Sequence, residues 1–190
     1  PAHHVIIMEI ETKIKTDNLE EIKNKLISIG AVFDKKARQA DEYYKPKGKE
    51  RETQRPGSFI LRIRNQDGEY TFTLKGLTET TGAWLEYETR IADADQMRKI
   101  LDKIGFSRIF TITKKREFGK LGDIGICIDN IDELGKYVEF EIISDSPEEA
   151  KKRINEIFEK LGVSEEQVEH RGYAAIISQN MGIKFEGTQG

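Results

Sequence analysis

Three stretches of the chain alternate charged with apolar residues, and each contains Glu-x-Glu. The first runs from Met8 to Lys15 and reads Met-Glu-Ile-Glu-Thr-Lys-Ile-Lys. The glutamate pairs are Glu9 and Glu11, Glu86 and Glu88, and Glu139 and Glu141. Successive side chains of a strand point to opposite faces, so each stretch predicts a strand with one charged and one apolar face. An amphipathic helical pattern follows each of them and ends near a glycine, at Gly30, Gly105 or Gly162.

Alternation predicts further strands, most of them joined as hairpins. They are expected over residues 58–65, 69–75, 110–119 and 124–129, with a short strand at 41–44. Residues 66–68 and 121–123 have the composition of hairpin turns. Residues 31–41 show no clear pattern, and a final helix is expected over 172–180. The chain is therefore predicted to be α+β, with about eight antiparallel strands and flanking helices.

A polar segment from Lys45 to Gly57 holds two prolines, two glycines and five basic residues. A mobile solvated loop is one interpretation of this composition. A basic lid over an anionic ligand is the other.

Composition narrows the classes of function. The chain has 190 residues and 34% charged residues, but a formal net charge of only -3, so no overall field attracts nucleic acid or a membrane. One cysteine and three histidines argue against a disulfide framework and a histidine-based zinc site. No apolar run is long enough to span a membrane, and a cytoplasmic protein is expected. We expect one domain over residues 6–183, with frayed ends at 1–5 and 184–190.

The charged faces of the strands indicate how the sheet closes. If every apolar face packs beneath helices, the charged faces share the opposite side, and a curled sheet would enclose them in a closed antiparallel barrel. The alternative is an open sheet with a solvated polar face. The charged residues on these faces are Glu9, Glu11, Lys13, Lys15, Arg62, Arg64, Lys75, Glu86, Glu88, Arg90, Lys114, Arg116, Asp129, Glu139 and Glu141.

Clustered carboxylates facing clustered bases suit a metal-bound polyphosphate. Mg²⁺ takes carboxylate and phosphate oxygens and keeps several waters. Lysine and arginine bind phosphate through charge-assisted hydrogen bonds. The sequence has neither a Gly-x-x-x-x-Gly-Lys-Ser/Thr loop nor a Gly-x-Gly-x-x-Gly turn, so it lacks the usual signatures of nucleotide-binding α/β domains.

Ordered motifs along the chain resemble the CYTH superfamily, which groups class IV adenylyl cyclases with thiamine triphosphatases. The resemblance covers roughly residues 8–178. It rests on Glu9-Ile-Glu11-Thr-Lys13, Leu61-Arg62-Ile-Arg64, Thr73-Leu-Lys75, Glu86-x-Glu88, Lys114-Lys115-Arg116, Asp129 before Leu134-Gly135, and Glu139-x-Glu141. The fold it implies is the triphosphate tunnel, a closed antiparallel barrel.

The resemblance also implies roles for particular residues. Its metal-binding carboxylates, for Mg²⁺ or Mn²⁺, correspond to Glu9, Glu11, Glu139 and Glu141, with Glu86, Glu88 and Asp129 as further acids. Its triphosphate-binding bases correspond to Lys13, Arg62, Arg64, Lys75, Lys114 and Arg116. Trp84 stands where many members carry arginine, and Arg90 is expected to supply that contact. Lys13, Arg62, Lys75 and Tyr173 are the residues expected to act in catalysis.

The function implied is a metal-dependent enzyme acting on a triphosphate such as ATP, thiamine triphosphate or tripolyphosphate. A class IV adenylyl cyclase, making cyclic AMP and pyrophosphate from ATP, is the preferred expectation. A thiamine triphosphatase or inorganic tripolyphosphatase is the first alternative, and a non-catalytic nucleotide- or polyphosphate-binding module is the second. A homodimer is left open as an assembly state.

Overall fold

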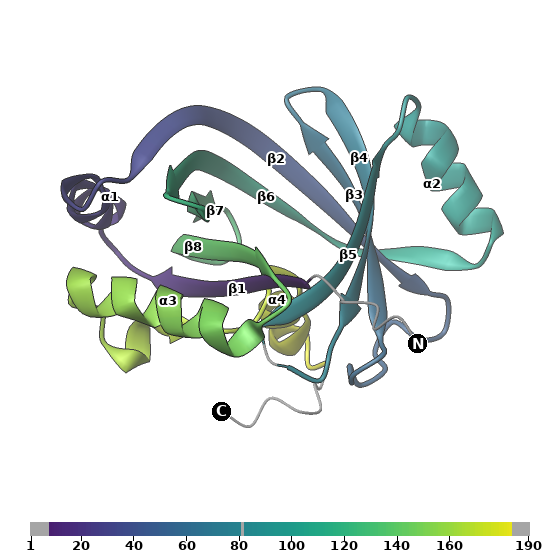
Figure 1. Cartoon of the computed structure of the whole chain (residues 1–190). Helices are drawn as coiled ribbons and strands as arrows, with labels where there is room; N and C mark the ends of the chain where they lie inside the picture. The colour runs from purple at the N-terminus through teal and green to yellow at the C-terminus, as the bar shows by residue number, and fades with distance from the viewer. Residues whose placement is uncertain (1–7, 81, 184–190) are drawn as a thin grey trace, which may run out of the picture.

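An eight-stranded antiparallel barrel forms the centre of the described part of the chain, which comprises residues 8–80 and 82–183 of a computed structural model (Figure 1). The strands are β1 Met8–Lys15, β2 Val32–Pro46, β3 Phe59–Gln66, β4 Glu69–Leu77, β5 Ala83–Arg90, β6 Phe106–Leu121, β7 Ile124–Ile131, β8 Gly135–Ser144 and the short β9 Val168–Glu169. The helices are α1 Leu19–Ser28, α2 Ala94–Lys103, α3 Pro147–Leu161, the 3₁₀ turn η1 Glu165–Gln167 and α4 Tyr173–Asn180.

Strand order shows how the sheet closes. The strands follow one another as β5-β4-β3-β2-β6-β7-β8-β1, and an additional β1–β5 pairing joins the two ends. That seam is short, because it pairs only Glu9 with Trp84 and Ile10 with Ala83. The rest of that edge of β1 pairs with β9. The prediction of a closed barrel is therefore confirmed, and the open solvated sheet is excluded.

Three helices cover the outside of the barrel. α1 and α3 pack against the apolar faces of β1, β7 and β8 in one core, which includes Ile10, Leu26 and Ile154. α2 lies at the other side of the molecule and packs over β3 and β4 in a second core, which includes Ile63 and Leu101 (Figure 1). Because the apolar faces turn outward to the helices, the charged faces turn inward.

Local sequence explains where these helices start and stop. Asn18 and Asp93 accept hydrogen bonds from backbone N–H groups in the first turns of α1 and α2. Pro147 stands in the first turn of α3, and Gly162 ends that helix in the left-handed conformation at φ 70°.

The fourth helix closes one end of the barrel. α4 places Tyr173, Ile176 and Ile177 in a third apolar cluster with Tyr43 and Ile131, residues from the ends of β2 and β7. None of the described helices has both the length and the apolar character needed to cross a membrane.

The main departure from the predicted elements is β2. A short strand was expected at 41–44 and a loop from Lys45, but one strand runs from Val32 to Pro46. Ala37, Gln39 and Asp41 on this strand are buried although none of them belongs to a conspicuous apolar pattern. None of residues 45–57 lines the cavity described below, so the structure gives no support to a basic lid.

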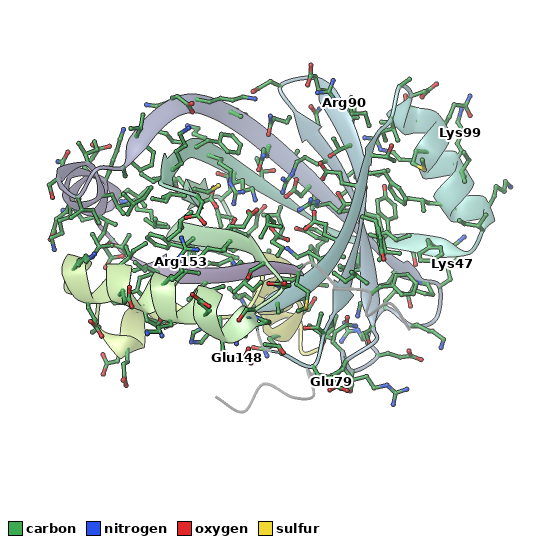
Figure 2. All side chains as sticks on the ribbon, in the orientation of Figure 1. Lys47, Glu79, Arg90, Lys99, Glu148 and Arg153 are labelled. Carbon is green, nitrogen blue, oxygen red and sulfur yellow. The ribbon has the colours of Figure 1, made fainter. Side chains whose placement is uncertain are left out.

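Two charged residues expected in the interior lie outside it. Lys15 ends β1 and is exposed. Arg90 ends β5 and is also exposed (Figure 2). Both have the correct alternation, but they stand at strand ends, beyond the part that the barrel encloses. The prediction that they line the interior is wrong. Ile100 and Ile104, two apolar residues at the C-terminal end of α2, are also exposed, because only one side of this helix contacts the sheet.

Candidate active site

The barrel interior is a charged cavity of about 560 Å³. Its charged lining residues are Glu9, Glu11, Arg62, Arg64, Lys75, Glu86, Glu88, Lys114, Arg116, Glu139 and Glu141. Lys13 and Asp129 are fully buried in its wall. The structure thus brings every predicted charged site residue to this cavity or its wall, except Arg90.

Two lysines lie between the glutamates of different strands. Lys13 Nζ lies 2.8 Å from Glu11 Oε1 and 3.3 Å from Glu139 Oε2. Lys75 Nζ donates to Glu9 at 3.0 Å and to Glu11 at 3.1 Å. These acids raise the pKa of both lysines against the opposing effect of burial, so both stay charged at neutral pH.

Arginines extend the ion-pair network along the β3–β5 wall. Arg62 Nη2 donates to Glu86 at 2.9 Å, to Glu88 at 3.2 Å and to the Thr73 hydroxyl at 3.1 Å. Its Nε is buried without a hydrogen-bond partner in the described residues. A donor of this kind is available to a ligand oxygen.

At the closed end, Arg116 lies at the centre of a second ion-pair cluster, with two acids. It donates to Asp129 at 2.7 and 2.5 Å and to Glu139 at 2.9 Å. Tyr173 Oη on α4 donates to Asp129 Oδ2 at 2.8 Å. The Tyr173 ring lies 5.0 Å from Lys13 Nζ, so it also lines the cationic part of the wall. Asp129 is thus a partner of Arg116 and Tyr173, which argues against its predicted place among the metal ligands.

Sequence reasoning missed one acid of this interior, Asp41 on β2. It is 0% exposed and accepts two hydrogen bonds from Arg64, at 2.6 and 2.7 Å. The available signal was the alternation of Ala37, Gln39, Asp41 and Tyr43, which puts small and polar side chains on one face of a strand.

Glu141 differs from the other interior acids because it forms no salt bridge with any described residue. Burial raises its pKa to about 8, assisted by the negative charges of Glu9 and Glu139 and by a hydrogen bond to Glu9. Burial likewise raises the pKa of Glu9, although Lys75 opposes the rise. Among the described residues Glu141 therefore has no cation beside it, and Glu9 shares its one cation, Lys75, with Glu11.

Lys114 is the corresponding base without a close partner. The nearest carboxylate oxygen, on Asp41, is 3.6 Å from its Nζ. Burial and the charge of Arg116 lower its pKa to about 8, although Asp41 opposes the fall. An anion beside Lys114 would compensate this missing interaction.

The carboxylates fit a hard divalent ion only in part. Among residues 8–80 and 82–183, no three His, Cys, Asp or Glu side chains converge as a ready metal site. Mg²⁺ bound to a triphosphate needs only one or two carboxylates, because phosphate and water oxygens complete its shell. Glu141, which has no salt-bridge partner among the described residues, and its neighbour Glu9, which shares Lys75 with Glu11, match that smaller requirement.

Aromatic side chains at the cavity are already in contact with other groups. Lys75 Nζ lies 5.1 Å from the Trp84 ring, and the guanidinium of Arg116 lies 5.9 Å from the Phe118 ring. Tyr43 stacks at a tilt on Phe110, with 5.1 Å between the ring centres. Trp84 is buried and packed in the wall.

Comparison with known proteins agrees with this fold. The family model described as CYTH domain matches residues 8–173. A protein of Methanocaldococcus jannaschii, MJ0240, whose name assigns it provisionally to the adenylate cyclases, is 34% identical over 173 residues, covering 88% of this chain and 97% of that protein. Adenylate cyclase CyaB of Aeromonas hydrophila is 24% identical over 99 residues, about half of each chain.

Solved structures show the same fold. The PH1012 protein of Pyrococcus horikoshii superposes with a TM-score of 0.77 and 28% identity, covering 88% of this chain and 98% of that one. The Hippeastrum protein HpAC1 superposes with a TM-score of 0.65 and 15% identity, covering 96% and 99%. Its structure is described as that of a provisional adenylyl cyclase with a dominant triphosphatase activity. The match of the family model over most of the chain and the similarity to MJ0240 show that the chain belongs to the CYTH family.

Proposed function

We propose that this protein is a divalent-metal-dependent enzyme that binds ATP by its triphosphate chain and forms cyclic AMP and pyrophosphate. One observation carries the proposal: the cavity pairs nearly all its own charges but leaves Glu141 without a base and Lys114 without a close acid. A metal cation with a polyphosphate anion supplies both missing charges together. A simple anion would satisfy Lys114 and leave Glu141 crowded.

The basic residues would hold the phosphates in an extended line. Arg62 and Lys75 project from neighbouring strands β3 and β4, and Lys114 and Arg116 project from β6 on another part of the wall. A chain of three phosphates can contact both groups, whereas one phosphate cannot. Such positioning lowers the barrier by fixing the reacting groups in line.

Glu9 and Glu141 would hold Mg²⁺ or Mn²⁺, which neutralises charge on the phosphate oxygens when bound. In the cyclase reaction the ribose 3′-oxygen bonds to the α-phosphorus, and the bond from that phosphorus to the leaving oxygen breaks. Pyrophosphate and the 3′-hydroxyl proton are released. The cationic side chains stabilise the charge that develops on pyrophosphate.

A triphosphatase is the second candidate, and the state of the aromatic residues favours it. Trp84 and Phe118 already contact cationic side chains, and Tyr43 already packs on Phe110. Few free ring faces remain to stack on a nucleobase. In this reaction water attacks the terminal phosphorus, and the same bases and carboxylates act on the triphosphate.

Product analysis tests both candidates. The protein is incubated with ATP, thiamine triphosphate or tripolyphosphate, each with Mg²⁺ or Mn²⁺ and each repeated with excess EDTA. Cyclic AMP with an equal amount of pyrophosphate supports the cyclase. Orthophosphate without a cyclic product moves the assignment to the triphosphatase. Binding of all three ligands without turnover would identify a non-catalytic module and contradict both candidates.

A further inference from the structure

Asp41 contacts two bases of the cavity, Arg64 and Lys114. It stands directly opposite Arg64 in the β2–β3 ladder, and both carboxylate oxygens accept hydrogen bonds from that guanidinium. One of them, Oδ2, is also 3.6 Å from Lys114 Nζ on β6. One buried carboxylate therefore links bases on the two strands that flank β2.

We propose that Asp41 is a positioning residue for triphosphate binding, which fixes the Arg64 guanidinium and keeps Lys114 in its charged form. This inference rests on the function proposed above. It does not make Asp41 a ligand of the metal or of the substrate, because its two oxygens are occupied by protein donors.

The Arg64 part of the inference follows from geometry. A guanidinium has five N–H donors in one plane. Asp41 takes Nε and Nη2 in a bidentate contact, so the plane is fixed and the remaining donors belong to the cavity side, where Arg64 is part of the lining. A side chain held in this way loses less conformational entropy when it binds phosphate.

The Lys114 part follows from the charges around it. Arg116 on its own strand and Arg64 on β3 repel its positive charge, while Asp41 on β2, Asp129 on β7 and Glu139 on β8 attract it. The ring of Tyr173 on α4 lies 5.1 Å from its Nζ. Asp41 is the strongest attractive neighbour.

The charge on Lys114 makes the binding of an anion depend on pH. The pKa of Lys114 in the folded protein is about 8, below the ordinary value of lysine. Its charge is therefore lost as pH rises through 8, and binding that needs the charge weakens there. Without Asp41 the pKa falls further, so that loss begins at lower pH. Each pH unit above the pKa of the free protein lowers affinity by up to about tenfold.

The test is calorimetric binding of tripolyphosphate in metal-free buffer from pH 6.5 to 8.5, with unchanged protein and Asp41→Asn. Tripolyphosphate itself titrates in this range, so the ratio of the two affinities is the readout. We expect Asp41→Asn to bind more weakly, and the ratio to widen by about tenfold between pH 6.5 and 8.5. Lys114→Arg is then introduced into both the unchanged protein and Asp41→Asn. Because its guanidinium stays charged at every pH used, the ratio of the two affinities should no longer depend on pH.

Glu42→Gln is the matched control. Glu42 is the next residue of β2 and also binds an arginine, but its partner Arg98 belongs to α2, outside the barrel. This variant should leave the affinity ratio near one at every pH. If Asp41→Asn does not fold, Arg64→Met alone is compared with the double variant Arg64→Met, Asp41→Asn. Neither of these variants leaves the Arg64 guanidinium buried without its acid.

The outcomes separate the two proposals. A ratio that stays constant with pH would show a merely structural role and overturn the Lys114 part of this inference. Unchanged affinity of Asp41→Asn at every pH would overturn it completely. If the unchanged protein fails to bind tripolyphosphate with and without Mg²⁺, the proposed function fails, and this inference fails with it.

Discussion

Tyr173 donates a 2.8 Å hydrogen bond to Asp129, which joins the helix that closes the barrel to the acidic cluster at its closed end. Burial and the charges of Asp129 and Glu139 raise the pKa of the phenol well above its usual range. The phenol therefore holds its proton at neutral pH and cannot serve as a general base. This position favours a structural role over the catalytic role predicted from sequence.

Tyr173→Phe should therefore reduce stability more than turnover. Removal of a buried hydrogen bond to a carboxylate costs about 1.5–3 kcal/mol in the free energy of unfolding. Urea unfolding measures this loss, and turnover should fall less than about tenfold. A fall of about 100-fold or more at unchanged stability would instead support a catalytic Tyr173.

Glu141→Gln should stabilise the metal-free protein and abolish its turnover. A carboxyl whose pKa is about 8 in the folded protein must take up a proton when the chain folds at pH 7, whereas the amide needs none. The amide also replaces a carboxylate oxygen that would bind the metal. A gain of about 1–3 kcal/mol is expected at pH 7. Thermal unfolding with EDTA and with Mn²⁺ measures both effects, since Mn²⁺ should stabilise the unchanged protein more.

Glu79→Gln is the control for that experiment, because Glu79 is an exposed glutamate away from the cavity (Figure 2). It should change neither stability nor turnover. Full activity of Glu141→Gln would remove Glu141 from the proposed metal site.

Arg62→Ala should weaken tripolyphosphate binding by about 10- to 100-fold, the usual cost of losing a charge-assisted hydrogen bond. Orthophosphate should be affected less, because a single phosphate can bind elsewhere along the cavity. Calorimetry with the two anions gives the comparison. Arg98→Ala, which removes an arginine outside the barrel, is the control. Equal losses for both anions would argue against one extended binding track.

Cys127 should report whether a ligand occupies the cavity. It is the one cysteine of the sequence, it is 8% exposed, and it lines the cavity. Burial raises its pKa to about 12, so its reaction with a thiol reagent at pH 8 should be slow in the folded protein and fast in urea. Tripolyphosphate with Mg²⁺ should slow it further. A rate that does not respond to a ligand shown to bind by calorimetry would place that ligand outside the barrel.

The alternating strands allowed much of the fold and site to be predicted. In β1, Ile10 and Ile14 are fully buried in the outer core, while Glu9 and Glu11 face the cavity, as the two-residue period requires. Strand closure did not follow from this pattern alone, because an open sheet with a solvated polar face has the same alternation. The clustering of acids with bases and the resemblance to the CYTH superfamily favoured the closed barrel.

The pattern failed where burial depends on position along the strand. Lys15 and Arg90 have the same alternation as their enclosed neighbours, but a strand end leaves the barrel, and no local signal in the sequence marks that point. The pattern also missed Asp41, for the opposite reason. An acid between polar neighbours looks solvated until its partner Arg64, from another strand, is placed beside it.

The pairing of Lys75 with Glu9 and Glu11 makes ligand binding a substitution rather than an addition. A phosphate that reaches Lys75 must displace carboxylates already bound there, and these carboxylates return when the product leaves. The glutamates thus compete with phosphate for Lys75, and this competition limits the affinity for the product. Because few solvent ions are exchanged in such a substitution, affinity should depend only weakly on salt, unlike binding to exposed lysines.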